Sequence, residues 1–297
     1  MIIIEVCGGL GNQMFQFALY TKMLTLGKEV KLDLTSFRSR QALRNFELGI
    51  FGVDCDIATE KEIRKYKKTR SWNKLLGHKT KENIYIENLD AGYQPIIYSF
   101  EDKYLQGYWQ CEKYFADIRD VILKKYIFPL KENSNCKKIL EQIKKTESVG
   151  LHVRRGDYLS EQNNKVYGNI CTIDYYQSAI SYIKRAVSNA VFFLFTNDMI
   201  WVRNHIYREG MIVVDCNDGE QDYLDMFLMS QCKHNIVANS SFSWWGAWLN
   251  QNTNKIVIAP SKWFNNHEVT DTICRDWVRI DNKGDLVKNE GGNYTVE

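Results

Sequence analysis

The chain has 297 residues, of which 44% are hydrophobic and 25% are charged, and its formal net charge is +3. This length is enough for one large or two modest domains with a sizeable core. The small net charge does not point to nucleic acid, although it is compatible with a small anionic ligand. With only three prolines, the composition argues against a collagen-like or low-complexity chain.

Eight cysteines are scattered along the sequence without a Cys-x-x-Cys pair, which argues against a zinc ribbon or a thioredoxin motif. Several lie in apolar runs and are expected to be small buried residues in a reducing compartment. The sequence has no apolar run of about 18 residues, and the apolar start is too short for a signal peptide. We therefore expect a cytoplasmic enzyme, with peripheral association with the inner membrane face as a further expectation.

The first half of the chain begins like an α/β unit. A strand is expected at 2–7, followed by the loop "GGLGNQ" and a helix with apolar residues at helical spacing that ends at Gly27. The segment 29–34 reads as a second strand. The lysine-rich segment 60–81 favours a solvated helix face, with a basic surface near an anionic acceptor or a membrane as the weaker interpretation.

A change from apolar to polar composition around 128–138 places a domain boundary between 135 and 136, giving domains 1–135 and 136–297. Beyond it, short apolar strands alternate with helices, which predicts a parallel sheet covered on both faces. The expected strands are 148–153, 190–196, 211–215, 235–239 and 255–260. The predicted fold is therefore α/β, with two doubly wound domains facing a central cleft.

Three of the expected strands in the second half end in polar residues, and ligands of open parallel sheets bind outside such strand ends. The residues are His152, Arg154, Arg155 and Asp157 after the first strand, Asn197 and Asp198 after the second, and Asn239, Ser240, Ser241, Phe242 and Ser243 after the third. Ser241 or Ser243 is expected to cap a helix whose N-terminus would bind an anion. Paired arginines suit a diphosphate, and an aspartate or asparagine can bind the edge of a base, so the set indicates a sugar nucleotide.

Each of these residues also has an ordinary structural explanation. Arg154 and Arg155 can form ion pairs with Asp157, His152 can be a hydrogen-bonded core histidine, and Asn197 and Asp198 can form a turn. Only the joint occurrence favours a ligand site.

The N-terminal loop has an alternative of its own. Gly9, Gly11 and Asp33 mimic a dinucleotide fingerprint, but Met14 occupies the place of the third glycine. An NAD-dependent oxidoreductase is therefore the weaker alternative. The loop can also bring its backbone close to a ligand, with Asn12 and Gln13 directed into the cleft.

Four stretches in this order resemble the inverting α-1,2-fucosyltransferases of glycosyltransferase family 11: "GGLGNQMFQFA", "HVRRGDY", "FTND" and "ANSSFSWWGAWL". The resemblance implies a GT-B-type fold with two Rossmann-like domains. It implies GDP-β-L-fucose as the donor, bound mainly by the C-terminal domain. A β-galactoside oligosaccharide or glycolipid would be the acceptor, mainly on the N-terminal side, with fucose passing to the galactose 2-hydroxyl.

The same resemblance suggests roles for individual residues. His152 would lie near guanine, with Asn197 and Asp198 binding its edge. Arg154 and Arg155 would bind the pyrophosphate, together with backbone and hydroxyl groups of Ser240, Ser241 and Phe242. Asn12, beside Gly11 in the glycine loop, would face the donor sugar or the acceptor.

The expected mechanism needs no metal or other cofactor, because arginines and helix N–H groups offset the charge that grows on the leaving diphosphate. Asp157 is the candidate general base, next to Arg154 as the second expected catalytic residue. A nucleic-acid-binding protein, resting on the basic segment, and a non-catalytic GDP-sugar-binding module are the competing hypotheses. We expect no nucleic acid among the partners.

Overall fold

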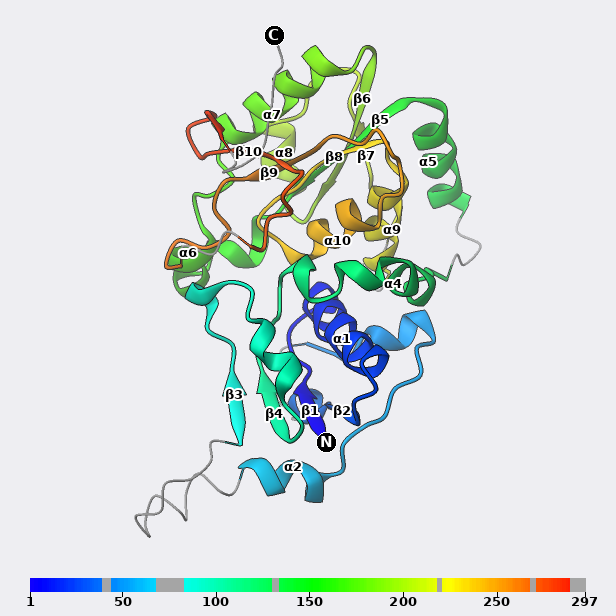
Figure 1. Cartoon of the computed structure of the whole chain (residues 1–297). Coiled ribbons are helices and arrows are strands. Elements are labelled where there is room, and N and C mark those ends of the chain that lie inside the picture. The colour runs from blue at the N-terminus through cyan, green and yellow to red at the C-terminus, as the bar shows by residue number, and fades with distance from the viewer. Residues whose placement is uncertain (39–43, 68–82, 130–133, 218–220, 268–270, 289–297) are drawn as a thin grey trace. The chain divides into compact units, whose positions relative to one another are not determined.

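The computed structural model describes residues 1–38, 44–67, 83–129, 134–217, 221–267 and 271–288, apart from the side chains of Ser134 and Asp157. It divides into two compact units, Met1–Pro129 and Leu130–Glu297 (Figure 1). The boundary expected between 135 and 136 lies six residues after this division. Each unit is an α/β structure built on a parallel sheet.

The N-terminal unit contains a sheet of four parallel strands in the order β2-β1-β4-β3. In the described ranges its strands are β1 (Ile2–Glu5), β2 (Val30–Asp33), β3 (Ile84–Ile86) and β4 (Lys103–Gln106), and its α-helices are α1 (Leu10–Thr25), α2 (Glu60–Lys67) and α4 (Arg119–Lys125). Six short 3₁₀ helices complete its described part: Thr35–Phe37, Leu48–Phe51, Leu89–Ala91, Pro95–Ser99, Glu112–Tyr114 and Ala116–Ile118.

Helix α1 is the central helix of this unit and is buried along most of its length. Leu24 is one of the apolar residues at helical spacing in this predicted helix, but it is 45% exposed. Gln13 and Gln16, by contrast, are fully buried and hydrogen-bonded. The basic segment forms α2 over Glu60–Lys67, with an ion pair between Arg64 and Glu60 on its exposed side; the rest of that segment lies outside the described residues.

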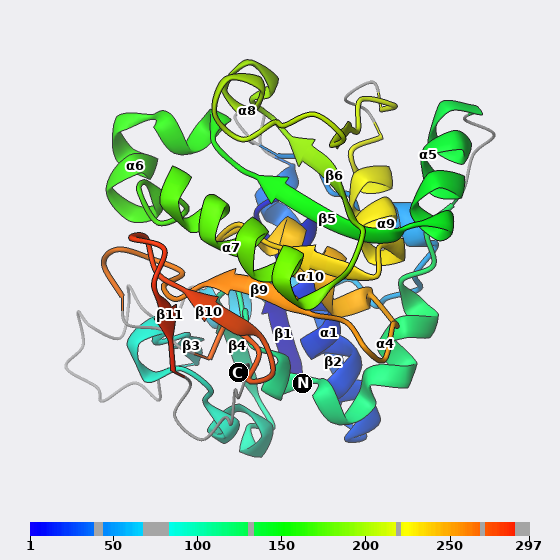
Figure 2. The same cartoon turned by 90° about the horizontal axis from the view of Figure 1, so that it is seen from above.

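The C-terminal unit contains a seven-stranded sheet in the order β11-β10-β9-β8-β5-β6-β7. The strands are β5 (Glu147–Val153), β6 (Ala190–Thr196), β7 (Ile212–Val213), β8 (His234–Ile236), β9 (Val257–Pro260), β10 (Val278–Ile280) and β11 (Leu286–Val287). The helices are α5 (Ser134–Lys145), α6 (Glu161–Tyr167), α7 (Ile173–Ala186), α8 (Met199–His205), α9 (Tyr223–Gln231) and α10 (Ser241–Leu249), with a 3₁₀ turn at Gly156–Leu159. Among the described strands of this sheet, only the edge strand β11 runs antiparallel to its neighbour, and Figure 2 shows it beside β10 and β9.

The first six strands of this unit follow the Rossmann order, with β5 in the place of the first strand and β8 in the place of the fourth. The chain crosses from one half of the sheet to the other between these two strands. Their carboxyl ends therefore flank the topological switch point, where open α/β sheets bind their ligands.

Strand β5 is buried on both faces, and its residues alternate in character. Val149, Leu151 and Val153 belong to the core that α7 and α8 complete on one face. On the other face the alternate positions are small or polar: a Cβ at Gly150 would lie 3.3 Å from the Cys232 sulfur. His152 is the last residue of this second row, and its ring lies beside that of Phe242 on α10.

Helices α9 and α10 pack closely against one another on this second face. A Cβ added at Gly246 would lie 2.8 Å from the Cβ of Met229. Trp244 and Trp245 are fully buried, and the Trp244 Nε1–H donates to the Thr272 carbonyl at 2.7 Å. Helix α10 is therefore fixed by the packing of its buried residues from Ser243 to Leu249, which holds its partly exposed N-terminus in place.

The predicted GT-B-type α/β class, with two Rossmann-like units, is confirmed. None of the helices in the described ranges has both the length and the apolar character that a membrane crossing requires.

Candidate active site

The three strand ends that the sequence singled out lie at one edge of the C-terminal sheet. Strand β5 pairs in parallel with β6 on one side, where Val153 lies opposite Thr196. It pairs in parallel with β8 on the other side, where Leu151 lies opposite Ile236. The residues that follow β5, β6 and β8 therefore leave the sheet at the same edge, around the switch point.

Arg155 is held in place by the first turn of α8. Its Nε–H donates to Asp198 Oδ2 at 3.3 Å, and its guanidinium carbon lies 4.2 Å from the centre of the Trp201 ring. Asp198 is also the N-cap of α8, since its Oδ1 accepts from the Trp201 N–H at 3.0 Å. The two terminal guanidinium nitrogens of Arg155 form no hydrogen bond with the described residues, and remain available to a ligand.

Asn197 fixes the backbone of the same arginine. Its Oδ1 accepts from the Arg155 N–H at 3.0 Å. The approach requires Gly156, because a Cβ there would lie 2.4 Å from Asn197 Nδ2. Asn197 Oδ1 and both carboxylate oxygens of Asp198 are thus engaged with the protein. This arrangement gives the two residues a role in holding Arg155, where the resemblance had suggested that they bind guanine.

Arg154 points to a different partner. Its guanidinium carbon lies 5.8 Å from the centre of the Tyr158 ring. The Tyr158 hydroxyl donates to the Asn239 carbonyl after β8 at 2.9 Å, and its ring stacks on Tyr167 at 4.8 Å. Tyr158 thereby joins the β5 and β8 strand ends across the switch point, a link that the sequence motif did not reveal.

His152 is buried at the same edge and is neutral. Burial, with a smaller effect of the nearby Arg154 charge, lowers its pKa to about 3. The residue is only 4% exposed, and its Nδ1 has no hydrogen-bond partner among the described residues. A buried polar atom without a partner is costly in a protein interior. The atom is therefore suited to a hydrogen bond with a ligand group.

The N-terminus of α10 lies next to this histidine, with the two rings of His152 and Phe242 5.8 Å apart. The N-cap residue is Ser240, whose side chain makes no capping hydrogen bond, so the expectation of Ser241 or Ser243 in that position was wrong. Ser243 Oγ instead donates back to the Ala238 and Ser240 carbonyls, both at 3.3 Å. The N–H groups of the first turn have no partner within the helix and favour an anion.

Asn239 is occupied within the protein. Its Nδ2 donates to the carbonyls of Tyr167 and Trp263, each at 3.2 Å. Its side chain is buried and joins the end of α6 to the segment after β9. Asp157, the expected base, belongs to the 3₁₀ turn Gly156–Leu159, but its side chain lies outside the described part, so its role stays a prediction.

Asp225 is a residue of this edge that the sequence motifs did not single out for binding. It lies in the first turn of α9, and its Oδ1 accepts a hydrogen bond from Asn217 Nδ2. Burial raises its pKa to about 7, and the nearby Asp222 also raises it. Cys136 Sγ donates to Asn217 Oδ1 at 3.0 Å. A carboxyl group of this kind can accept hydrogen bonds from the N–H groups of a base.

The glycine loop of the N-terminal unit lies at the equivalent edge of its own sheet. Gly8 has a φ of +80°, and a Cβ there would lie 2.6 Å from Asn12 Nδ2. Asn12 Oδ1 accepts from Gln110 Nε2, after β4, at 2.7 Å. Gly11 lies inside α1 and is buried. The conformation that needs glycine is therefore at Gly8, not at the positions of the dinucleotide pattern.

Gln13 does not point toward a ligand. Its Nε2 donates to the Gly8 and Asn45 carbonyls at 2.9 and 2.8 Å, and its Oε1 accepts from the Glu47 N–H at 2.8 Å. The expectation that Gln13 faces a ligand was wrong, because its buried amide instead joins the loop to the segment after β2.

Asp33, the acidic residue of the dinucleotide pattern, is also engaged. It is buried, and its Oδ2 accepts from the Tyr104 hydroxyl at 2.7 Å and lies 3.2 Å from Lys67 Nζ. These contacts leave little of the carboxylate for the ribose of a dinucleotide.

Glu87 is a second residue that the sequence patterns missed. Its Oε2 accepts from the N–H groups of Tyr108 and Trp109 at 2.7 and 2.9 Å. Burial raises its pKa despite these two donors. The contact needs Gly107, where a Cβ would lie 2.5 Å from the Cβ of Glu87. Glu87 thus fixes the loop that carries Gln110.

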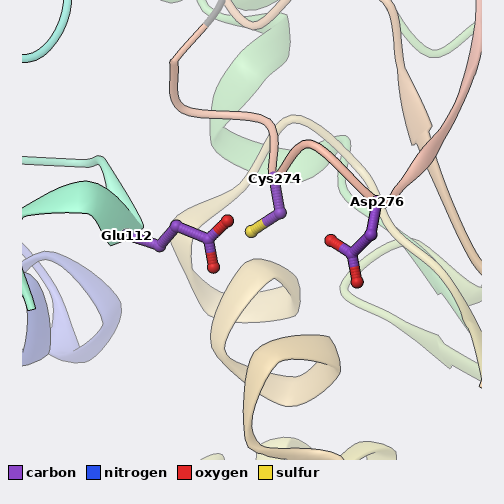
Figure 3. Close-up of side chains that lie close together, drawn as sticks. All are labelled: Glu112, Cys274 and Asp276. Atoms are coloured by element: carbon purple, nitrogen blue, oxygen red, sulfur yellow. The ribbon is translucent and has the colours of Figure 1, made fainter. Parts of the chain in front are cut away.

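A pair of possible metal ligands lies before β10 in the C-terminal unit. The Cys274 sulfur and an Asp276 carboxylate oxygen are within 4.8 Å of one another (Figure 3). Glu112, which Figure 3 also shows, belongs to the N-terminal unit. Two side chains do not complete the four-ligand set of a structural zinc site, and we assign no metal to the pair.

Comparisons with known proteins identify the family. The model of "Glycosyl transferase family 11" matches residues 1–281. An α-1,2-colitosyltransferase of Escherichia coli is 33% identical over 296 residues, which cover 95% of this chain and 99% of that protein. The O-antigen biosynthesis glycosyltransferase WbnK of Escherichia coli is 32% identical over 306 residues, with 92% and 98% covered.

A more distant relative is the galactoside α-(1,2)-fucosyltransferase 1 of Leontopithecus chrysomelas, 27% identical over 154 residues that cover 49% of this chain and 42% of that protein. The match of the family model across nearly the whole chain, with two relatives similar over their full length, confirms the predicted resemblance. The chain is a glycosyltransferase and belongs to glycosyltransferase family 11.

Proposed function

We propose that the protein transfers L-fucose from GDP-β-L-fucose to the 2-hydroxyl of a terminal β-galactoside, with inversion and without a metal. The observation that carries this proposal is the geometry of Arg155. Its guanidinium is held by Asp198 and Trp201 at the mouth of β5, with two terminal nitrogens available. Across the switch point, the first turn of α10 offers N–H groups beside a buried, unpartnered His152 nitrogen. Fork-shaped donors opposite a helix N-terminus suit a diphosphate.

The chemistry follows from charge. The acceptor oxygen forms a bond to the anomeric carbon of fucose, and the bond between that carbon and the β-phosphate oxygen breaks. Negative charge grows on the diphosphate as the bond breaks. The Arg155 guanidinium, Arg154 and the α10 N–H groups stabilise that charge more than they stabilise the intact donor, which lowers the barrier. Asp157 is our proposed acceptor of the hydroxyl proton.

The base of the donor needs hydrogen-bond acceptors that the protein has not already used. Asn197 and Asp198 are engaged with Arg155, so we assign the base to His152 and Asp225. Among the described residues, His152 Nδ1 has no hydrogen-bond partner, and Asp225 is partly exposed at the start of α9. We place the acceptor on the N-terminal unit, where Asn12 and Gln110 join the ends of β1 and β4.

A second donor follows from one relative. Similarity to an α-1,2-colitosyltransferase favours GDP-activated colitose as the alternative to GDP-fucose. The oxidoreductase alternative loses its support, since the chain belongs to a glycosyltransferase family and Asp33 is engaged with Tyr104.

A donor panel tests the proposal. The purified protein is incubated with lactose and one donor at a time: GDP-fucose, GDP-colitose or UDP-galactose. We expect transfer from GDP-fucose with release of GDP. Transfer from GDP-colitose alone would support an α-1,2-glycosyltransferase whose donor sugar is colitose instead of fucose. Transfer from UDP-galactose alone would refute GDP as the nucleotide of the donor.

A further inference from the structure

We propose that Trp201 is a positioning residue, whose ring fixes the plane of the Arg155 guanidinium for the diphosphate. This inference rests on the proposed function, in which the diphosphate is the leaving group. It adds a residue that lies outside the arginine, asparagine and serine stretches of the sequence. Its evidence is a set of contacts between the segment that follows β5, the β6–α8 turn and α8.

One helical turn supplies two different contacts to the same guanidinium. Asp198, the N-cap of α8, accepts from Arg155 Nε–H at 3.3 Å, and Trp201 places its ring 4.2 Å from the guanidinium carbon. A guanidinium over an indole face is attracted by the ring's quadrupole and also stacks on it. The carboxylate fixes one edge of the guanidinium and the ring fixes its plane, so the two terminal nitrogens point in a defined direction.

The Trp201 ring is itself fixed by its surroundings. It stacks on the His205 ring at 4.7 Å with an interplanar angle of 16°, and His205 Nδ1 lies 2.8 Å from the Trp201 carbonyl oxygen. The Trp201 side chain also packs against the core cluster of the C-terminal unit. A ring held by its own helix and by the core can restrict the motion of a partly exposed arginine.

The neighbouring arginine provides the contrast. Arg154 lies 5.8 Å from its aromatic partner Tyr158, whereas the distance for Arg155 is 4.2 Å. The closer contact belongs to the arginine whose terminal nitrogens are unused by the described residues. Ordering a long side chain costs conformational entropy. Because Trp201 orders the Arg155 side chain in the free protein, less of that entropy is lost when the ligand binds.

The test is a double-mutant cycle with GDP as the probe. Trp201→Leu removes the aromatic face and keeps an apolar side chain, whereas Trp201→Phe keeps an aromatic face. Each is made in the wild-type and the Arg155→Ala background, and the GDP dissociation constant is measured by titration calorimetry. Ile200→Ala is the matched control, since Ile200 is the preceding residue of α8 and is 78% exposed.

We expect Trp201→Leu to weaken GDP binding about tenfold, or roughly 1.4 kcal/mol, because the Arg155 side chain would then lose its conformational entropy on binding. Trp201→Phe should weaken it about two- to threefold, and Ile200→Ala should leave it unchanged. In the Arg155→Ala background, Trp201→Leu should have less than a twofold effect.

Two results would overturn the inference while leaving the proposed function intact. One is an equal loss of GDP affinity for Trp201→Leu in both backgrounds, since the effect of Trp201 would then not depend on Arg155. The other is a failure of Trp201→Phe to bind GDP better than Trp201→Leu. If the wild-type protein neither binds GDP nor transfers fucose, the proposed function itself fails, and the inference falls with it.

Discussion

The contact between α9 and α10 gives a prediction with a magnitude that the structure sets. In Gly246→Ala, the new Cβ would lie 2.8 Å from Met229 Cβ, 3.2 Å from Cε and 3.4 Å from Sδ. The sulfur and the terminal methyl can rotate away. The Met229 Cβ cannot, because it is attached directly to the backbone of α9, so the two helices must separate.

Two effects oppose one another in this variant. Alanine is favoured over glycine in a helix interior by about 0.5–1 kcal/mol. Overpacking a well-packed core costs typically about 1–3 kcal/mol. Because the close contact involves a fixed atom, we expect the overpacking to win, with a net loss of about 1 kcal/mol. In a domain of this size that loss lowers the melting temperature by about 2–4 °C.

The assay combines thermal unfolding with GDP titration, because α10 carries Ser240, Ser241 and Phe242 at its N-terminus. Gly246→Ala should melt earlier and bind GDP a few times more weakly. Gly49→Ala is the control, since a Cβ there meets nothing within 4 Å, and its stability should stay within about 0.5 kcal/mol of the wild type. A Gly246→Ala protein as stable as the wild type would refute the packing argument.

Three further predictions concern the site. Arg154→Lys should lose most transfer activity, because a point charge cannot replace the fork-shaped donors; near-wild-type turnover would remove Arg154 from the diphosphate site. Asp198→Asn should weaken GDP binding without loss of stability, since the Oδ1 cap of α8 remains, whereas Asp198→Ala should also lose about 1 kcal/mol of stability; equal melting temperatures for the two variants would contradict this. For Asp225, a folded pKa of about 7 against 3.8 in the unfolded chain means that its stabilising effect is complete below about pH 4 and is lost as pH rises through 7. The melting-temperature advantage of Asp225→Asn over the wild type should therefore grow between pH 5 and pH 8, and a constant difference would exclude the raised pKa.

The sequence predicted the features that depend on local pattern. The strand 148–153 was evident because small and apolar residues predominate from Val149 to Val153, and the structure forms β5 there. The polar residues at the ends of β5, β6 and β8 were correctly expected at one edge, because parallel strands place their carboxyl ends together.

The tertiary contacts that decide the roles of individual residues could not be predicted from local sequence patterns. Asp225 is hydrogen-bonded to Asn217. Asn217 in turn accepts a hydrogen bond from Cys136, which lies 81 residues earlier in the chain. No local pattern encodes such a cluster. Gln13 looks like a solvent- or ligand-facing amide in sequence, yet the fold buries it against carbonyls of two loops.

Asn197 and Asp198 show the same limit at the site itself. Their residue types suit a base, and they do lie at the expected strand end. Whether they bind a ligand or the protein depends on where Arg155 points, and that direction is set by Trp201 on the following helix. The residue type identifies the possible chemistry, and the tertiary contacts determine which partner uses it.

The most direct test of the central claim is mass spectrometry of a reaction of the purified protein with GDP-fucose and lactose in the presence of EDTA. The account predicts a fucosylated trisaccharide that an α-1,2-specific fucosidase cleaves, formed at an undiminished rate in the chelator. Absence of a trisaccharide with lactose and with longer β-galactosides, from a protein that also fails to bind GDP, would contradict it.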